Sequence, residues 1–215
     1  MGVIAAEWRK LGLPGFWVAA AVATGCSWLL AAVMSGSRGA AQTLQLVPRC
    51  AVLGFILLGV LAATGEYAGR QVVTTCVAMP RRAQVVVAKL MTVTAALLGA
   101  ALVTVLGLRL LAGVGEWGLP GVTAYLVAMG LLGHAIGLVL RHLVPALTTA
   151  LVFLVVLPPA LLPYTRLASW LPGAVGVDLF AASPEHSVMQ SAAALSGWVT
   201  LLWGIAMITW MRRDI

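Results

Sequence analysis

Charged side chains are scarce in this 215-residue chain, in which Asp, Glu, Lys and Arg together make up 9% of the residues. Hydrophobic residues make up 62%, whereas soluble domains carry about 25% charged and about 45–50% apolar residues. This balance excludes a water-soluble globular domain. Six acidic residues against 13 basic ones leave a net charge of +7. Because the basic residues lie in short segments between apolar runs, we interpret the excess as membrane topology and expect no nucleic-acid partner.

Several sequence patterns that carry chemistry are also missing. Three cysteines without CxxC spacing support neither a disulfide framework nor a zinc site. The chain has no GxxxxGK(S/T) phosphate-binding motif and no recognisable Ser/His/Asp set. His142, His186 and Asp178 fall in predicted loops without metal-ligand spacing. We therefore expect no catalytic residue, no metal site and no cofactor in this chain.

Long apolar runs bounded by charged residues, Gly and Pro account for the whole length. A helix needs about 20 apolar residues to cross about 30 Å of hydrocarbon, so about six such helices fit. We therefore predict an all-α membrane protein in which residues 1–215 form one transmembrane domain. The predicted spans are 14–35, 47–65, 84–108, 120–140, 144–164 and 192–211. Since the first run is longer than a signal-peptide core and further spans follow, we expect no cleavage near Ala32.

Basic residues divide unequally between the two sides of this six-span topology. With both termini on one side, nine of the 13 basic residues fall on that side and four on the other. Because Lys and Arg are more frequent in cytoplasmic loops, we predict a multi-pass protein of the inner cell membrane with both termini in the cytoplasm. The residues predicted on the external side are Arg38, Arg49, Arg109 and Arg166. Arg49 and Arg109 would extend to lipid headgroups there without needing a ligand.

A short amphipathic helix is predicted before the first span. Ile4, Trp8 and Leu11 recur at helical spacing, whereas the charged residues between them fall off that stripe. Such a helix would lie flat on the cytoplasmic leaflet. The alternative is a charged lead-in to the first span without a helix of its own.

The longest predicted external connection runs from Thr165 to Ser191 and mixes apolar residues with Pro and Gly. It is too broken to cross the membrane. We predict short re-entrant helices that dip into the outer leaflet, because irregular backbone at membrane depth must be covered by protein or line a cavity. A plain solvent loop would leave Trp170 and Phe180 in water.

The richest cytoplasmic segment joins the second and third predicted spans. It reads Gly65-Glu66-Tyr67-Ala68-Gly69-Arg70-Gln71-Val72-Val73-Thr74-Thr75-Cys76-Val77-Ala78-Met79-Pro80-Arg81-Arg82, and Lys89 follows in the next span. Within 67–79 only Gly69 breaks a helix, and Pro80 ends the run, so we predict a helix of about three turns lying against the membrane. Gly69 and the β-branched residues of 71–75 are poor helix formers, so the sequence does not fix where this helix begins and ends.

This segment resembles the first cytoplasmic loop of type-2 ABC transporter permeases, the membrane-spanning subunits of exporters of the drug and peptide-antibiotic type. That loop commonly reads Glu-Tyr, a few polar residues, Thr, then Pro-Arg-Arg and a Lys several residues on. The matching residues here are Glu66, Tyr67, Thr74, Pro80, Arg81, Arg82 and Lys89. The opening Glu7-Trp8-Arg9-Lys10-Leu11 resembles the family's amphipathic elbow helix.

The resemblance implies that this loop is a coupling helix, which docks into a groove on a cytoplasmic ATPase subunit. The implied docking residues are Tyr67, Arg70, Gln71, Thr74 and Thr75. The residues implied at the cytoplasmic gate or interface are Glu66, Arg81, Arg82 and Lys89. The three basic residues also have a simpler role open to them, holding the loop at anionic headgroups at about 1 kcal/mol each. For Glu66, a gate-proximal charge pair and a plain helix-end position are both open.

The resemblance further implies that the chain moves a hydrophobic or amphipathic substrate outward, such as a drug, a peptide antibiotic or a lipid. ATP and Mg²⁺ would be bound by the separate ATPase subunit, so the chain itself would not be an enzyme. A six-span permease of this kind also needs a second permease, identical or related, and it contacts membrane lipid.

His134 is an ionisable residue in the middle of the fourth predicted span. Gly130, Gly133 and Gly137 share its helical face, and the spacing of the last two is typical of close helix packing. We therefore expect His134 to face another helix, in an interhelical hydrogen bond rather than as a proton relay or substrate contact. The alternative function is an ion-coupled carrier or a membrane-embedded enzyme that uses Glu66 and His134.

Overall fold

The computed structural model describes residues 14–68, 82–115 and 118–212, and these ranges are almost entirely helical, with no strand among them. The long helices are α2 (Pro14–Ala68), α4 (Arg82–Ala112), α5 (Leu119–Leu140) and α9 (Val188–Arg212). Between α5 and α9 lie α6 (Leu143–Leu151), the π-helical turn η1 (Val152–Val156), α7 (Leu157–Leu161), the 3-10 turn η2 (Arg166–Trp170), α8 (Pro172–Val175) and the 3-10 turn η3 (Val177–Leu179).

Six helical segments in this structure are long and apolar enough to cross a membrane. They are Gly15–Ser37, Gly39–Gly65, Val87–Ala112, Leu119–Leu140, Leu143–Leu161 and Val188–Trp210. The predicted all-α fold with six spans is confirmed, and the chain is a multi-pass membrane protein. The predicted elbow helix, residues 4–11, lies outside the described residues.

The first two spans meet at one residue, Gly39. Its φ of 77° and ψ of 169° interrupt the helical conformation inside α2, and this region of backbone space is open essentially to Gly alone. The second span therefore begins at Gly39, and the predicted start at 47 with a loop before it is wrong. The polar residues of 40–46 fit a helix because Thr43 donates to the carbonyl of Gly39 at 2.8 Å and Gln45 donates to the carbonyl of Phe180 at 3.1 Å.

Prolines shape the fifth span, which ends at Leu161 instead of the predicted 164. Pro158 and Pro159 have no N–H, so neither can donate to the carbonyl of Leu154 as an α-helical or π-helical partner. The helix widens into η1 just before them. Gly173 of α8 packs directly on the Leu154 carbonyl, where a Cβ would overlap the oxygen.

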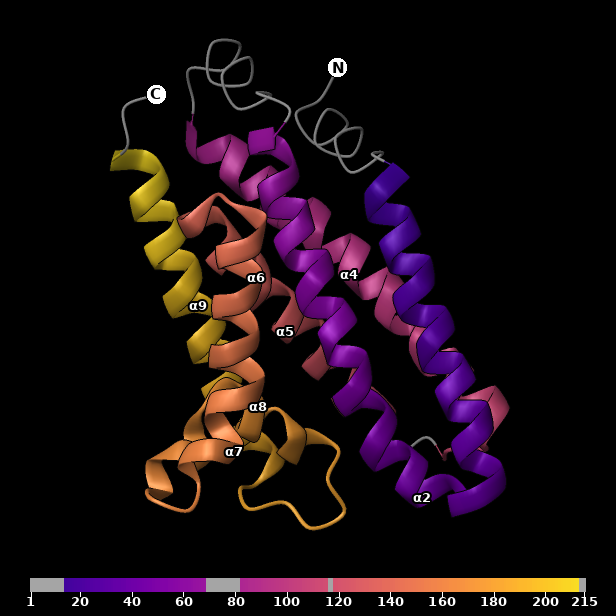
Figure 1. Ribbon diagram of the computed structural model, residues 1–215. Helices are drawn as coiled ribbons and strands as arrows, with labels where there is room; N and C mark the ends of the chain where they lie inside the picture. The colour runs from indigo at the N-terminus through magenta and orange to yellow at the C-terminus, as the bar shows by residue number, and fades with distance from the viewer. Residues whose placement is uncertain (1–13, 69–81, 116–117, 213–215) are drawn as a thin grey trace.

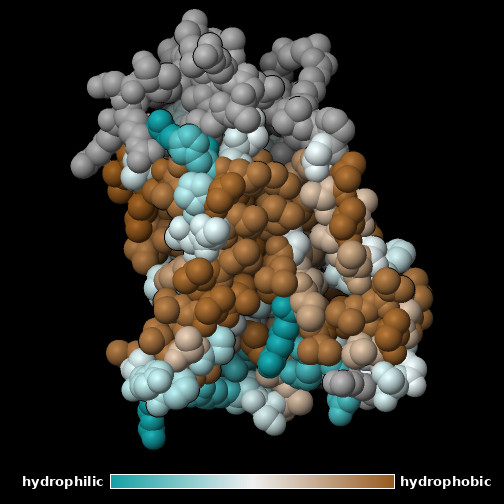
Figure 2. Space-filling model, in the orientation of Figure 1, coloured by the Kyte–Doolittle hydropathy of each residue, from teal (hydrophilic) through white to brown (hydrophobic). Residues whose placement is uncertain are grey.

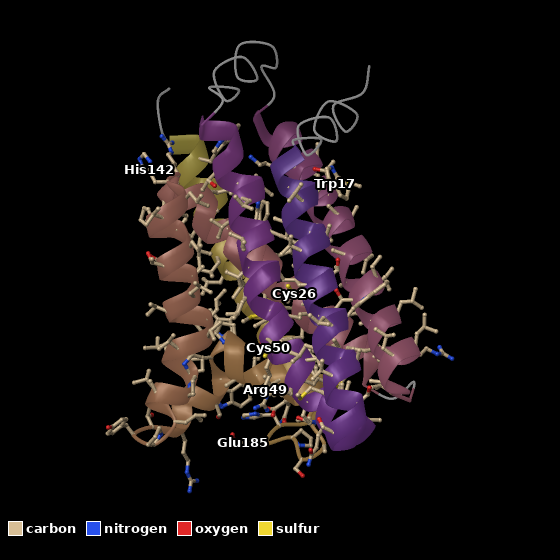
Figure 3. All side chains as sticks on the ribbon, turned by 45° about the vertical axis from the view of Figure 1, so that its right-hand side comes forward. Trp17, Cys26, Arg49, Cys50, His142 and Glu185 are labelled. Carbon is tan, nitrogen blue, oxygen red and sulfur yellow. The ribbon has the colours of Figure 1, made fainter. Side chains whose placement is uncertain are left out.

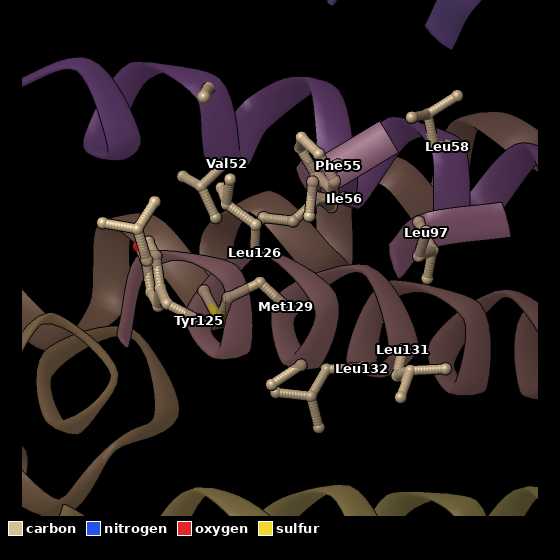
Figure 4. Close-up of a cluster of buried hydrophobic side chains, with 14 of the residues drawn as sticks. Val52, Phe55, Ile56, Leu58, Leu97, Tyr125, Leu126, Met129, Leu131 and Leu132 are labelled. Carbon is tan, nitrogen blue, oxygen red and sulfur yellow. The ribbon is translucent and has the colours of Figure 1, made fainter. Parts of the chain in front are cut away.

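Helix α5 is the centre of the bundle. In the apolar stretch that defines each span, 72% of the residues of α5 are buried, against 17% of those of α9. Helices α2, α4, α6 and α9 all pack on it, as Figure 1 shows. Figure 4 shows the core between α2, α4 and α5, whose fully buried side chains include Phe55, Ile56, Leu97, Leu126, Met129 and Leu132.

Glycines let α2 and α5 approach closely. A Cβ on Gly59 would overlap the carbonyl oxygen of Gly130. On the other helix, a Cβ on Gly133 would lie 2.8 Å from the carbonyl oxygen of Ile56, and one on Gly137 would lie 2.7 Å from the Cβ of Ala63. The predicted close packing at Gly133 and Gly137 is confirmed, and its partner is the second span.

The bundle has two distinct ends. The terminal end contains the first residue of α2, the last residue of α9 and the ends of the two helices that flank 69–81 (Figure 1). The cap end contains α7 and the cap segment, residues 162–187, which includes η2, α8 and η3. Hydrophobic side chains cover the middle of the face seen in Figure 2, and hydrophilic ones gather at the cap end. This distribution is that of a helical bundle surrounded by lipid.

Candidate functional site

Most residues implied for the coupling helix lie outside the described residues. These are Arg70, Gln71, Thr74 and Thr75, together with Arg81. The backbone of α2 includes Glu66 and Tyr67, and α4 begins at Arg82, but the side chains of these three lie outside the description as well. The described backbone establishes that α2 and α4 both meet this segment at the terminal end.

Lys89 lies two turns into α4 and is buried, with 7% of its surface exposed. Its side chain therefore faces the bundle, and this burial favours an interface role over a contact with lipid headgroups.

His134 forms the main polar contact between the second and fourth spans. Its side chain is fully buried, and Nδ1 lies 3.0 Å from the carbonyl oxygen of Gly59. A carbonyl can only accept, so Nδ1 carries the proton and donates. The ring stacks on Trp203 of α9, with centroids 5.4 Å apart and planes 23° apart. The prediction that His134 faces another helix is confirmed, and its interhelical hydrogen bond is observed.

Two ring nitrogens in this contact have no hydrogen-bond partner within the described part of the chain. They are Nε2 of His134 and Nε1 of Trp203, which belong to the stacked pair. Nε2 can accept a hydrogen bond and the indole N–H can donate one. The contact therefore joins α2, α5 and α9 at one level of the bundle.

Replacement of His134 tests whether its role is structural. The Leu variant keeps much of the volume but loses the donor to Gly59, and we expect it to lower the stability of the purified chain by about 1 kcal/mol. The Asn variant retains a donor at a similar distance from the backbone and should lose less. Denaturant unfolding in detergent measures both changes. Transport per folded molecule should stay unchanged, and its complete loss in the stable Asn variant would instead favour the proton-relay role.

A cavity of about 300 Å³ lies at the cap end, between α2, α5, the fifth span and the cap segment. Its apolar lining includes Val52, Leu154, Pro158 and Val177. Its polar lining comes from three parts of the chain and consists of Arg49, Tyr125, Ser169, Asp178 and Glu185. Figure 3 shows Arg49 and Glu185 at this end, opposite His142 and Trp17.

Contacts at the cap end hold the cap segment in place. Both carboxylate oxygens of Asp178 accept hydrogen bonds, from the backbone N–H of Glu185 at 3.2 Å and from the backbone N–H and Nδ1 of His186 at 3.3 and 2.8 Å. The His186 ring packs against Trp170 at 4.3 Å, and Trp198 of α9 donates to the Trp170 carbonyl at 2.8 Å. The cap segment is therefore attached to the bundle by specific contacts.

Sequence reasoning missed this cavity. The segment before the last span contains the short helices η2, α8 and η3, whereas their re-entry into the membrane stays a prediction. Phe180 is buried and Trp170 is half-exposed. Arg49, expected only at lipid headgroups, lines the cavity instead. Residues 49, 125 and 185 are far apart in the chain, and no local pattern brings them together.

Comparison of the chain with protein-family models and with curated proteins finds no match. Within the described residues, no group of three or more His, Cys, Asp or Glu side chains could hold a metal ion. Cys26 and Cys50 are free and exposed. The features that bear on function are therefore the polar contact around His134, the cap-end cavity and the segment between α2 and α4.

Proposed function

We propose that this chain is the membrane-spanning permease subunit of an ATP-driven ABC exporter, which moves a hydrophobic or amphipathic substrate outward. The observation that carries the proposal is the segment from Glu66 to Lys89, whose residues resemble the coupling loop of type-2 ABC permeases. The six-helix bundle supports it, because α2 and α4 meet this segment at the same end of the bundle as both described chain ends. A force applied there would act directly on two spans.

The orientation follows from the distribution of basic residues. In the described chain, Arg141 follows α5 and Arg212 ends α9 at the terminal end, whereas Arg109 lies in the last turn of α4 and Arg166 begins η2 at the other. The full sequence adds most of its remaining basic residues to the terminal side. The terminal end is then cytoplasmic, in the inner cell membrane, and the cap segment supplies external re-entrant helices.

The partners follow from what one chain contains. ATP and Mg²⁺ bind to a separate cytoplasmic ATPase subunit, and no chemical step is assigned to this chain. A second permease, identical or related, completes the pathway. Only 22%, 22% and 17% of the residues in the apolar stretches of the first, fifth and sixth spans are buried. Their outer faces are therefore open to lipid or to this second permease.

Reconstitution into proteoliposomes tests the proposal. The full chain is purified alone and together with the soluble ATPase that co-purifies with it, and transport of an amphipathic dye is measured with ATP or with a proton gradient. We expect transport only with the ATPase and ATP. Transport by the isolated chain along a proton gradient, without nucleotide, would contradict the proposal and favour an ion-coupled carrier using Glu66 and His134.

A further inference from the structure

We infer that the cap-end cavity binds a zwitterionic amphipath, with the apolar part of the ligand inside the cavity and its anionic and cationic groups at Arg49 and Glu185. This inference deepens the proposed function, on which it rests only for the identification of the ligand as the exported substrate. Binding itself is a property of the isolated chain and can be measured without an ATPase.

The apolar part of such a ligand would contact a preformed wall. The cavity volume of about 300 Å³ is at the lower end of the range for small-molecule sites. Close backbone packing holds the wall together, because Gly173 covers the Leu154 carbonyl and a Cβ on Gly176 would lie 2.5 Å from the Tyr125 ring. Leu154, Pro158 and Val177 therefore keep their places without a ligand.

The charged groups at the cavity come from different elements. Arg49 belongs to α2 and Glu185 to the cap segment, and both are exposed. In the part of the chain that the structure describes, neither side chain forms an ion pair or a side-chain hydrogen bond. Asp178 differs, because His186 and two backbone N–H groups already occupy its oxygens. The cavity therefore offers one unengaged positive group and one unengaged negative group.

This arrangement favours a ligand that carries both charges. A purely anionic amphipath at Arg49 would also face Glu185 and Asp178, and a purely cationic one at Glu185 would face Arg49. Like charges disfavour each of these ligands. A zwitterion satisfies both groups, and its apolar part removes the cavity wall from water or headgroups. A phosphatidylethanolamine headgroup and an acylated amino acid share this chemistry.

Binding to the full-length chain in detergent tests the inference. Each probe has one saturated hydrocarbon chain of equal carbon number: lysophosphatidylethanolamine and Nα-dodecanoyl-lysine are the zwitterions, lysophosphatidylglycerol is the anion and dodecylammonium is the cation. We expect at least one zwitterion to bind about tenfold more tightly than both singly charged probes. Tight binding of both zwitterions would show that the cavity recognises the charge pattern. Tight binding of the phospholipid alone would also support the inference and would identify a membrane lipid as the ligand.

Variants that remove single charges test whether Arg49 and Glu185 bind the charged groups of the ligand. Arg49→Gln and Glu185→Gln should each weaken zwitterion binding about tenfold, and the exchange Arg49→Glu with Glu185→Arg should recover part of the loss. Arg166→Gln, which removes an exposed arginine at the same end but outside the cavity lining, is the matched control. Thermal unfolding identifies any variant that does not fold. The inference is wrong if the folded variants bind as the unmodified chain does, or if a singly charged probe binds as tightly as the zwitterions.

Discussion

Replacing Arg70 and Thr74 together by Glu is expected to abolish ATP-driven transport while leaving membrane insertion intact. If the segment between α2 and α4 docks on an ATPase, the double variant places two negative charges on the docking face and removes one positive charge. Like-charge contacts and a lost charge pair at a protein interface cost several kcal/mol, enough to weaken subunit association at least about 100-fold. Co-purification of the ATPase and transport in proteoliposomes measure the two effects.

Two control variants separate docking from general damage. Arg70→Lys with Thr74→Ser keeps charge and hydroxyl and should retain most transport. Arg166→Glu makes the same Arg-to-Glu reversal at the cap end, where the residue is exposed, and should leave ATPase association unchanged. Normal transport by the Glu double variant would remove the docking assignment and leave the segment with a membrane-surface role.

Gly59→Ala is expected to cause a large loss of stability. The new Cβ would overlap the backbone oxygen of Gly130 and lie 2.9 Å from the backbone N of His134. Backbone atoms cannot rotate away, so α2 and α5 must separate, and the hydrogen bond from His134 to Gly59 is then lost. Overpacking of this kind costs about 1–3 kcal/mol and occasionally more, and the lost interhelical bond adds about 0.6 kcal/mol.

Gly99→Ala provides a matched comparison, because it makes the same change inside another span. A Cβ on Gly99 would meet no atom within 4 Å, and Ala is favoured over Gly in a helix by about 0.8–1.0 kcal/mol. We expect its unfolding midpoint to equal or exceed that of the unmodified chain, while Gly59→Ala falls well below it. Equal midpoints for the two variants would contradict the close α2–α5 contact. Denaturant unfolding of the full chain in detergent provides the measurement.

The gross fold was predictable because a membrane imposes one dominant constraint. A span must be long, apolar and helical, so six apolar runs yield six helices. The boundary errors arose where this constraint is weak. Residues 40–46 contain Gln and Thr and precede Pro48, and we therefore predicted that they lie before the second span. In the structure they are helical because Gln45 reaches the carbonyl of Phe180, a partner 135 residues away.

Some features of the candidate sites could also be predicted from the sequence, and others could not. The position of His134 on a glycine-rich face predicted a contact with another helix, since small residues mark where helices approach closely. Its partners, Gly59 and Trp203, depend on tertiary packing and have no local signal. The cap-end cavity was harder still to predict from the sequence, because Arg49 and Glu185 come together only when the cap segment folds onto the bundle. The coupling-loop assignment rests on the sequence pattern and remains a prediction.

The junction at Gly39 also bears on how the first span is attached to the bundle. Two backbone torsion angles at that residue connect the first span to the second, and few of its side chains are buried. Near its middle, Trp28 donates to the carbonyl of Val103 at 3.0 Å and packs on Gly107 of α4. Ala23 of the same span also packs on Gly54 of the second span, and Phe16, Ala20 and Ala31 are buried in the core. The first span is therefore attached to the bundle by its covalent junction at Gly39 and by side-chain contacts along its length, so replacing Trp28 alone would leave it in place.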